Sequence, residues 1–428
     1  MRIVRYPKTE DWTGLLQRPA NDMSKVETRV RKILRAVKLG GDDVLRDLSR
    51  TIDKAEIDDL QVHVSEFEHA GKQVSKQLKE AINIAKANIE NFHRVVCEKS
   101  EIIETFPGVT CWRRTVPIER VGLYVPAGSA PLFSTVLMLA IPAKLAGCRE
   151  VMICTPPGPD GRVCDAILYT AKLCGVTKVF KLGGAQAIAA MAYGTPTVAR
   201  VDKIFGPGNS FVTCAKQIVS KDVAIDMPAG PSEVAVLADE SCEPAFVAAD
   251  LLSQAEHGTD SQVVLISSTE SVIERVLEKV YEQLDSLPRR KVAARALEHS
   301  LAILVRTPDE AIELINNYAP EHLILALEKS ESAAELIKNA GSVFIGNYSC
   351  ESAGDYASGT NHTLPTGGFA RSMSGISVDS FVKKITFQKL TPAGIRNLGP
   401  TIESMAMAEG LAAHSRAISI RREALDGV

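Results

Sequence analysis

A chain of 428 residues is long enough for two or three domains and for large buried cores that need no covalent staples. Hydrophobic residues make up 45% and charged residues 24%, as in an ordinary globular protein, and the formal net charge of −3 excludes a global basic field that would bind nucleic acid. The longest apolar run, residues 135–143, is too short to span a bilayer and contains Pro142.

Residues 1–23 are polar and irregular, which is typical of an N-terminal arm. They contain no apolar signal core, so we expect a cytoplasmic protein. The nine cysteines are scattered without a CxxC spacing, which favours reduced thiols over disulfides or a cysteine-based zinc site. Apolar positions at helical spacing then predict helices through residues 24–53 and 78–96.

From about residue 119, short β-rich runs that end in Gly or Pro alternate with helical patterns. This alternation predicts βαβ units, and hence α/β domains whose parallel sheets are covered by helices on both faces. It continues after residue 230, and two sheets are favoured because one open sheet with so many strands would be unusually wide. Residues 346–376, rich in Gly, Ser and Asn, predict a long functional loop. From residue 377 onward the pattern is helical.

Three groups of polar residues could hold a metal ion. Gln254 and His257 lie three apart on one predicted helix face, and both residue types can ligate zinc. Alone, this spacing equally describes a polar helix end. In the Gly-rich loop, Asp355 could supply a carboxylate ligand or serve turn chemistry. On the last helix, Glu409 and His414 do not share a face, so they flank a cleft or pack against a second subunit.

Other residues could bind a cofactor or transfer protons. The turns LGGAQA (182–187) and FGPGNS (205–210) lie where open α/β sheets bind ligands, but neither is a GxGxxG fingerprint, and tight turns would look the same. Ser232 lies in the similar loop PAGPSEV. Glu321 and His322 follow Pro320 and are either an acid–base pair or a polar entry to a strand.

Several longer stretches carry a resemblance to one family. DMPAGPSEV, DLLSQAEHGTDSQ, PEHL, ESAGDYASGTNHTLPT and EGLAAHSRAI resemble the histidinol dehydrogenases, in matching order over nearly the whole chain. The resemblance implies oxidation of L-histidinol to L-histidine through a bound aldehyde, the last step of histidine biosynthesis. It also implies two NAD⁺ used in succession, one bound Zn²⁺ per subunit and an intertwined homodimer. The implied fold is two incomplete Rossmann-like α/β domains with small helical N- and C-terminal tails.

With that fold in view, we divide the chain into four parts. The N-terminal arm is 1–23, and the first α/β domain is 24–123 plus 231–376. The second α/β domain, which would contact NAD, is 124–230. The C-terminal helical tail, 377–428, would reach the partner subunit.

The resemblance also implies residue roles. The acid–base pair corresponds to Glu321 and His322. The zinc ligands correspond to Gln254, His257, Asp355 and His414. The substrate contacts correspond to Ser232, Gln254, His257, His322, Asp355, His362, Glu409 and His414. The NAD contacts correspond to Tyr124, Gln186 and Asn209. Cys350, where the family has proline, and Gly367, where an aromatic is common, depart from the pattern and could alter loop stiffness.

We hypothesise that His322 takes the alcohol proton and that Glu321 activates the water that hydrates the aldehyde. The zinc ion would hold the substrate. Alternatives are a zinc hydrolase without NAD that uses Glu321 or Glu351, a metal-stabilised dimer without activity, and a dehydrogenase of another amino alcohol.

Overall fold

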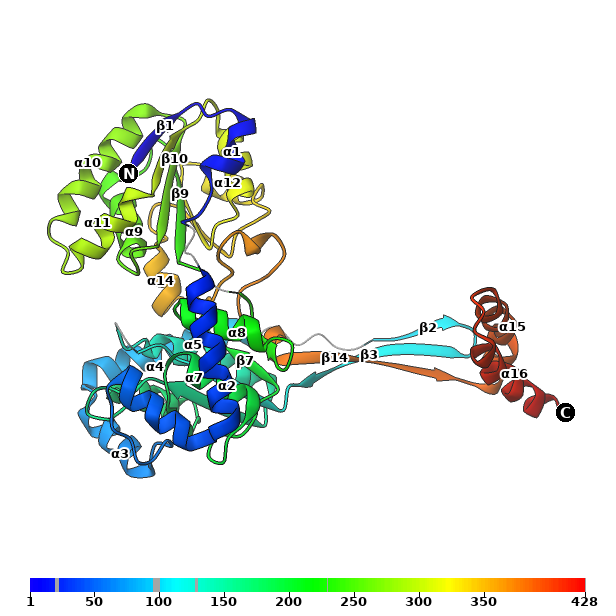
Figure 1. Cartoon of the computed structure of the whole chain (residues 1–428). Coiled ribbons are helices and arrows are strands. Elements are labelled where there is room, and N and C mark those ends of the chain that lie inside the picture. Colours follow the sequence, from blue (N-terminus) through cyan, green and yellow to red (C-terminus); the bar gives the residue numbers. More distant parts are fainter. Residues whose placement is uncertain (20–22, 95–100, 128–129, 229, 428) are drawn as a thin grey trace. The chain divides into compact units, whose positions relative to one another are not determined.

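The computed structural model describes residues 1–19, 23–94, 101–127, 130–228 and 230–427. The chain divides into two compact units (Figure 1). The first comprises Met1–Val95 and Glu119–Phe381, and the second comprises Val96–Ile118 and Val382–Val428. Among the described residues, no helix combines the length and apolar character needed to cross a membrane.

A six-stranded parallel sheet forms one core of the first unit. Its order is β1 (Arg2–Arg5), β11 (Leu301–Leu304), β10 (Gln262–Ser267), β9 (Glu233–Ala238), β12 (His322–Ala326) and β13 (Ser342–Ile345). The central strands β9, β10 and β12 each begin with a polar residue and are otherwise apolar, except for Ser267 at the end of β10, because helices cover both faces. The N-terminal segment, expected to be irregular, contributes the edge strand β1.

Successive residues of these strands pack against different helices. Val234, Val236 and Ala238 of β9 join a core built with one set of helices, α9 (Pro244–Ala255), α10 (Glu270–Leu284) and α11 (Arg290–Glu298). Ala235 and Leu237 face the opposite core, which contains α1 (Trp12–Leu15) and α12 (Pro308–Tyr318). Figure 1 shows these two helix layers on either side of the sheet.

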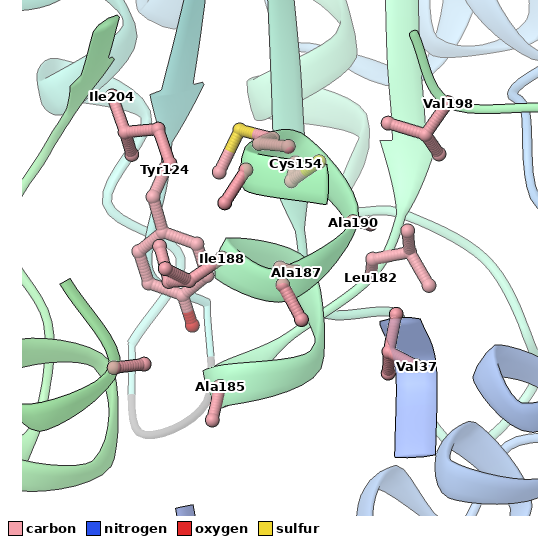
Figure 2. Close-up of a cluster of buried hydrophobic side chains, with 14 of the residues drawn as sticks. Val37, Tyr124, Cys154, Leu182, Ala185, Ala187, Ile188, Ala190, Val198 and Ile204 are labelled. Atoms are coloured by element: carbon pink, nitrogen blue, oxygen red, sulfur yellow. The ribbon is translucent and has the colours of Figure 1, made fainter. Parts of the chain in front are cut away.

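A five-stranded parallel sheet forms the other core of the first unit. Its order is β6 (Lys178–Lys181), β5 (Glu150–Thr155), β4 (Arg120–Tyr124), β7 (Lys203–Phe205) and β8 (Ala224–Ile225). Its helices are α2 (Met23–Leu48), α3 (Val64–Gln73), α4 (Lys76–His93), α5 (Phe133–Ala146), α6 (Asp165–Leu173), α7 (Gly184–Tyr193) and α8 (Ser210–Val219). Figure 2 shows the alanines of α7 packed beside Tyr124 and Cys154. The two helix-covered parallel sheets confirm the predicted α/β class.

The second unit is an antiparallel sheet with two helices. Its strands are β14 (Val382–Leu390), β3 (Val109–Pro117) and β2 (Ile102–Phe106), and its helices are α15 (Pro392–Ala408) and α16 (Ala412–Asp426). The prediction of helix from residue 377 onward is wrong for β14. Its nine residues pair with β3, which is more than 260 residues away in the chain, and Phe387 stacks on Trp112 at 5.3 Å. A pairing that distant overrides local propensity.

Gly206, directly after β7, occupies a position that excludes side chains. Its φ is +122°, and a Cβ there would collide with the carbonyl oxygen of Tyr124. We expect Gly206→Ala to lower the free energy of unfolding by about 2 kcal/mol or more, because both the backbone and the neighbour must shift. Chemical denaturation measures this change in the free energy of unfolding. Gly71→Ala in α3, where a Cβ meets nothing within 4 Å, is the control and should be neutral or stabilising.

Candidate active site

The acid–base candidates meet at the amino end of β12. Ala319 adopts a left-handed conformation (φ 52°) and Pro320 follows, so the chain bends just before the strand. Glu321 therefore precedes the regular alternation of the strand, and its Oε2 lies 3.7 Å from Nδ1 of His322. Both side chains are buried. Neighbouring residues of a regular strand point to opposite faces, but the bend before β12 lets these two share one site.

The main chain of Glu233, the first residue of β9, contacts both members of the pair. Its N–H donates to Glu321 Oε2 at 2.9 Å, and its carbonyl oxygen lies 3.3 Å from His322 Nδ1. A carbonyl only accepts, so His322 must carry its proton on Nδ1 to make this bond. The other ring nitrogen, Nε2, is then free to accept a proton from a substrate.

Three side chains beside this pair could hold a metal ion. Ligand atoms of His257, Glu351 and Asp355 all lie within 4.8 Å of one another. His257 follows the end of α9, whereas Glu351 and Asp355 are four residues apart on α14 (Glu351–Tyr356) and therefore share a helix face. Asp355 Oδ1 also lies 3.5 Å from His322 Nε2.

Gln254, which is fully buried on α9, lies between the Glu233 N–H and the Glu351 carboxylate. In the amide orientation that satisfies both neighbours, its oxygen accepts from the Glu233 N–H at 3.0 Å and its nitrogen donates to the Glu351 carboxylate. Among the described residues, His322 Nε2 and Asp355 Oδ1 are buried and make no hydrogen bond. Buried polar atoms of this kind indicate a ligand position.

Burial and charge shift the proton affinities of the cluster. Burial raises the pKa of Glu321 to about 8 and that of Glu351 well above its ordinary range. Burial alone would lower the pKa of His322, but the carboxylates of Glu351, Glu321 and Asp355 outweigh it and raise that pKa to about 10. Although burial opposes it, the His322 ring holds the pKa of Asp355 below its ordinary value.

The chain is similar to known proteins over nearly its whole length. A family model described as histidinol dehydrogenase matches residues 16–422. A histidinol dehydrogenase of Bacteroides thetaiotaomicron is 55% identical over 426 residues, covering 99% of this chain and 100% of that protein. The crystal structure of histidinol dehydrogenase from Elizabethkingia anophelis is 52% identical, with a TM-score of 0.97 over 100% of this chain and 99% of that one. This chain belongs to the histidinol dehydrogenase family. It is therefore an oxidoreductase.

The residues that resemblance assigns to the histidinol dehydrogenase site fall into three places. Gln254, His257, Asp355, Glu321 and His322 are brought together as described. His362 joins them, with Nδ1 2.8 Å from the Asp355 carbonyl and Nε2 3.2 Å from Thr135 Oγ1 on α5. Ser232 lies directly before β9. Glu409 and His414 belong to the second unit, where both are exposed.

The residues assigned to NAD lie at the carboxyl edge of the five-stranded sheet. Tyr124 ends β4, and its hydroxyl accepts from the Gly184 N–H at the start of α7, 3.0 Å away. Gln186 donates to Asp53 at 3.1 Å, and Asn209 caps α8 through its side-chain oxygen. Two helix N-termini therefore point to this edge, as they do in phosphate-binding sites.

Sequence reasoning gave two residues no role in the family site. Glu351 was weighed only as the base of a hydrolase, because α14 is hidden in a Gly- and Ser-rich stretch. Its spacing of four from Asp355 was the available signal. Glu233 carried no signal, because its contacts to Glu321 and His322 run through the main chain.

The raised pKa of Glu321 predicts a pH-dependent stability. The folded protein binds this proton more tightly than the unfolded chain does, so the metal-free protein should lose stability between about pH 4.5 and pH 8. Glu321→Gln removes this loss. The free energy of unfolding of the variant, minus that of the parent, should therefore increase by on the order of a few kcal/mol between pH 5 and pH 8. Thermal or urea denaturation across this range measures the difference, and Glu335→Gln at an exposed position should run parallel to the parent.

Proposed function

We propose that this protein oxidises L-histidinol to L-histidine through a bound histidinaldehyde, with two successive hydride transfers to NAD⁺, as the last step of histidine biosynthesis. The observation that carries the proposal is the cluster in which a buried carboxyl and a buried imidazole meet a set of nitrogen and oxygen ligands, within a chain of the histidinol dehydrogenase family. The free thiols among the described residues suit a reducing compartment, the cytoplasm.

The donor set fits a zinc ion. His257 and Asp355 offer one imidazole and one carboxylate, and the unbonded Asp355 Oδ1 supports a cation position. Gln254 would add an amide oxygen on turning its amide from the Glu233 N–H toward these ligands. A bound zinc ion supplies a Lewis acid that anchors the substrate's nitrogen atoms. A cation beside Asp355 would oppose the carboxylates that raise the pKa of His322 and so would act in the same direction as burial, toward the neutral imidazole that a base requires.

His322 serves the first proton transfer. As the hydride of the alcohol carbon passes to NAD⁺, Nε2 takes the hydroxyl proton, while the Glu233 carbonyl holds Nδ1–H. The products of this step are the aldehyde and NADH. Glu321 serves the second half by taking a proton from the water that adds to the aldehyde. The resulting anion of the hydrate would give up a hydride to a second NAD⁺ and one further proton to solvent, and would so become the carboxylate.

Tyr124, Gln186 and Asn209 would bind NAD⁺ at the carboxyl edge of the five-stranded sheet. Burial raises the pKa of Tyr124 to about 12, so its hydroxyl keeps its proton and can still donate a hydrogen bond. The N-termini of α7 and α8 offer N–H groups to a pyrophosphate, which explains how a chain without a GxGxxG fingerprint could bind a dinucleotide.

A homodimer would complete the site. The second unit exposes a set of large apolar side chains, namely Ile102, Ile103, Phe106, Met405, Met407, Leu411 and Ile420. Apolar exposure of this extent indicates a protein interface. We assign this interface to a second copy of the chain, whose Glu409 and His414 would supply the remaining substrate and zinc contacts.

One assay tests the activity itself. Zinc-loaded protein given histidinol and NAD⁺ should form histidine and NADH in a ratio of about one to two, because each product molecule requires two hydride transfers. Chelation should abolish turnover and leave the far-UV circular dichroism unchanged. Histidinol consumption without NADH would instead support the hydrolase, and greater activity on another amino alcohol would change the substrate.

Glu321→Gln should separate the two half-reactions. Aldehyde formation depends on His322 and should fall less than about tenfold, whereas oxidation of added histidinaldehyde should fall about 100-fold or more, because its general base is lost. Stopped-flow NADH formation from each substrate measures the two rates. His322→Asn, the comparison variant, should impair aldehyde formation. Equal losses in both half-reactions of Glu321→Gln would contradict this division of roles.

Mixed dimers test the contribution of His414. His257→Ala and His414→Ala should each be inactive alone. When the two chains are co-expressed with different tags, mixed dimers should have one intact site, and about a quarter of the parental activity should return if half of the dimers are mixed. Absence of any recovery in purified mixed dimers would mean that His414 acts within its own chain.

A further inference from the structure

The carboxylate of Glu233 is buried beneath the acid–base pair and is held from two directions. Only 1% of its side chain is exposed. Arg18 Nη2 donates to Oε2 at 2.7 Å, and Arg18 Nε lies 3.2 and 3.3 Å from the two oxygens. The Gly367 N–H donates to Oε1. A planar guanidinium bound in this two-pronged way fixes the orientation of the carboxylate as well as its charge.

The same guanidinium holds the segment that leads into the acid–base pair. Arg18 Nη2 donates to the Tyr318 carbonyl at 2.6 Å and approaches that of Ala319 at 3.4 Å. Its central carbon lies 4.0 Å from the centroid of the Tyr318 ring. Arg18 therefore joins the start of β9 to the bend that precedes Glu321.

The segment that carries Arg18 is firmly docked. Trp12 is 1% exposed and belongs to the core between α12 and the six-stranded sheet. The Gln17 carbonyl accepts from the Gln262 side chain at 3.3 Å, and Gln262 in turn accepts from the Tyr318 hydroxyl at 2.9 Å. Arg18 is thus placed by the packing of the residues that precede it and does not depend on the ion pair alone for its position.

From these contacts we propose that Arg18 and Glu233 are positioning residues for the acid–base pair, an inference that rests on the proposed function. Glu233 donates its N–H to Glu321 and accepts from His322 through its carbonyl, so any rotation of the Glu233 main chain disturbs both groups together. Arg18 prevents that rotation by binding the Glu233 carboxylate and the Tyr318 carbonyl at once.

An ion pair with a purely structural role would behave differently. It would lower the stability of the protein when broken, and the remaining folded molecules would turn over at the parental rate. A positioning role predicts a lower kcat with little change in the KM values for histidinol and NAD⁺, because the altered groups act in proton transfer.

The experiment uses the zinc-loaded full chain with Arg18→Met, Arg18→Lys and the control Arg5→Met. Arg5 lies in the same N-terminal segment and pairs with Glu270 at 2.6 Å, but that pair is about half exposed. For Arg18→Met we expect kcat to fall about 10- to 100-fold, with KM values within about threefold and zinc content unchanged. Arg18→Lys keeps the charge without the two-pronged geometry and should recover part of the loss. Arg5→Met should match the parent.

A double-mutant comparison measures the coupling between Arg18 and Glu321 directly. In a Glu321→Gln background, Arg18→Met should add far less to the loss of aldehyde oxidation than it costs alone, because residues that act as a unit are not additive. A parental kcat in Arg18→Met, or losses that multiply in the double variant, would overturn the proposal. If Arg18→Met does not fold, Arg18→Lys takes its place in the same comparison.

A readout independent of turnover separates this proposal from the proposed function. In ¹⁵N NMR of imidazole-labelled protein, the His322 Nδ1–H signal should be protected and shifted downfield in the parent and in Arg5→Met. It should be lost or moved in Arg18→Met, because its acceptor carbonyl belongs to Glu233. An unchanged His322 signal in Arg18→Met would refute the positioning role even if the protein were inactive on histidinol.

Discussion

Parallel pairing of β9 with β12 is the constraint on which the site depends. It aligns His322 with Val234 and so places the two peptide groups of Glu233 beside the acid–base candidates. The bend at Ala319 and Pro320 then lets the consecutive residues Glu321 and His322 lie in one site. Shifting the register of β12 by one residue would send His322 to the other face of the sheet, and no side-chain substitution could compensate.

The two proposed sites lie at opposite edges of their parallel sheets. In the five-stranded sheet the assigned cofactor residues lie at the carboxyl ends of strands and at the N-termini of α7 and α8, which favour anions. In the six-stranded sheet the site lies at the amino ends of β9 and β12, beside the C-terminal end of α9, where the helix dipole favours cations. This difference suits a dinucleotide at one sheet and a metal ion at the other.

The sequence predicted more of the fold than of the site. Alternating β-rich and helical runs were enough for two parallel sheets, because central strands such as β9 and β10 are buried along their whole length and so have mostly apolar sequences. β14 was missed because its partner, β3, is distant in the chain, and α14 because its Gly and Ser content resembles a loop. The spacing of Gln254 and His257 was visible, but their convergence with Asp355 depends on packing between α9 and α14. Arg18 and Glu233 could not be found, since main-chain contacts leave no pattern of side-chain types.

The charge balance of the candidate site is consistent with the proposed cation. Glu321, Glu351 and Asp355 are enclosed with one imidazole, and the raised pKa values of the two glutamates show that burial makes three separate negative charges too costly. Without a cation, the cluster must keep its carboxyls protonated or protonate His322, and either choice removes a base. The proposed divalent ion would change that balance, since it would favour ionised carboxylates beside a neutral His322. The same ion would therefore hold the substrate and prepare the proton acceptors, which ties metal binding to both half-reactions.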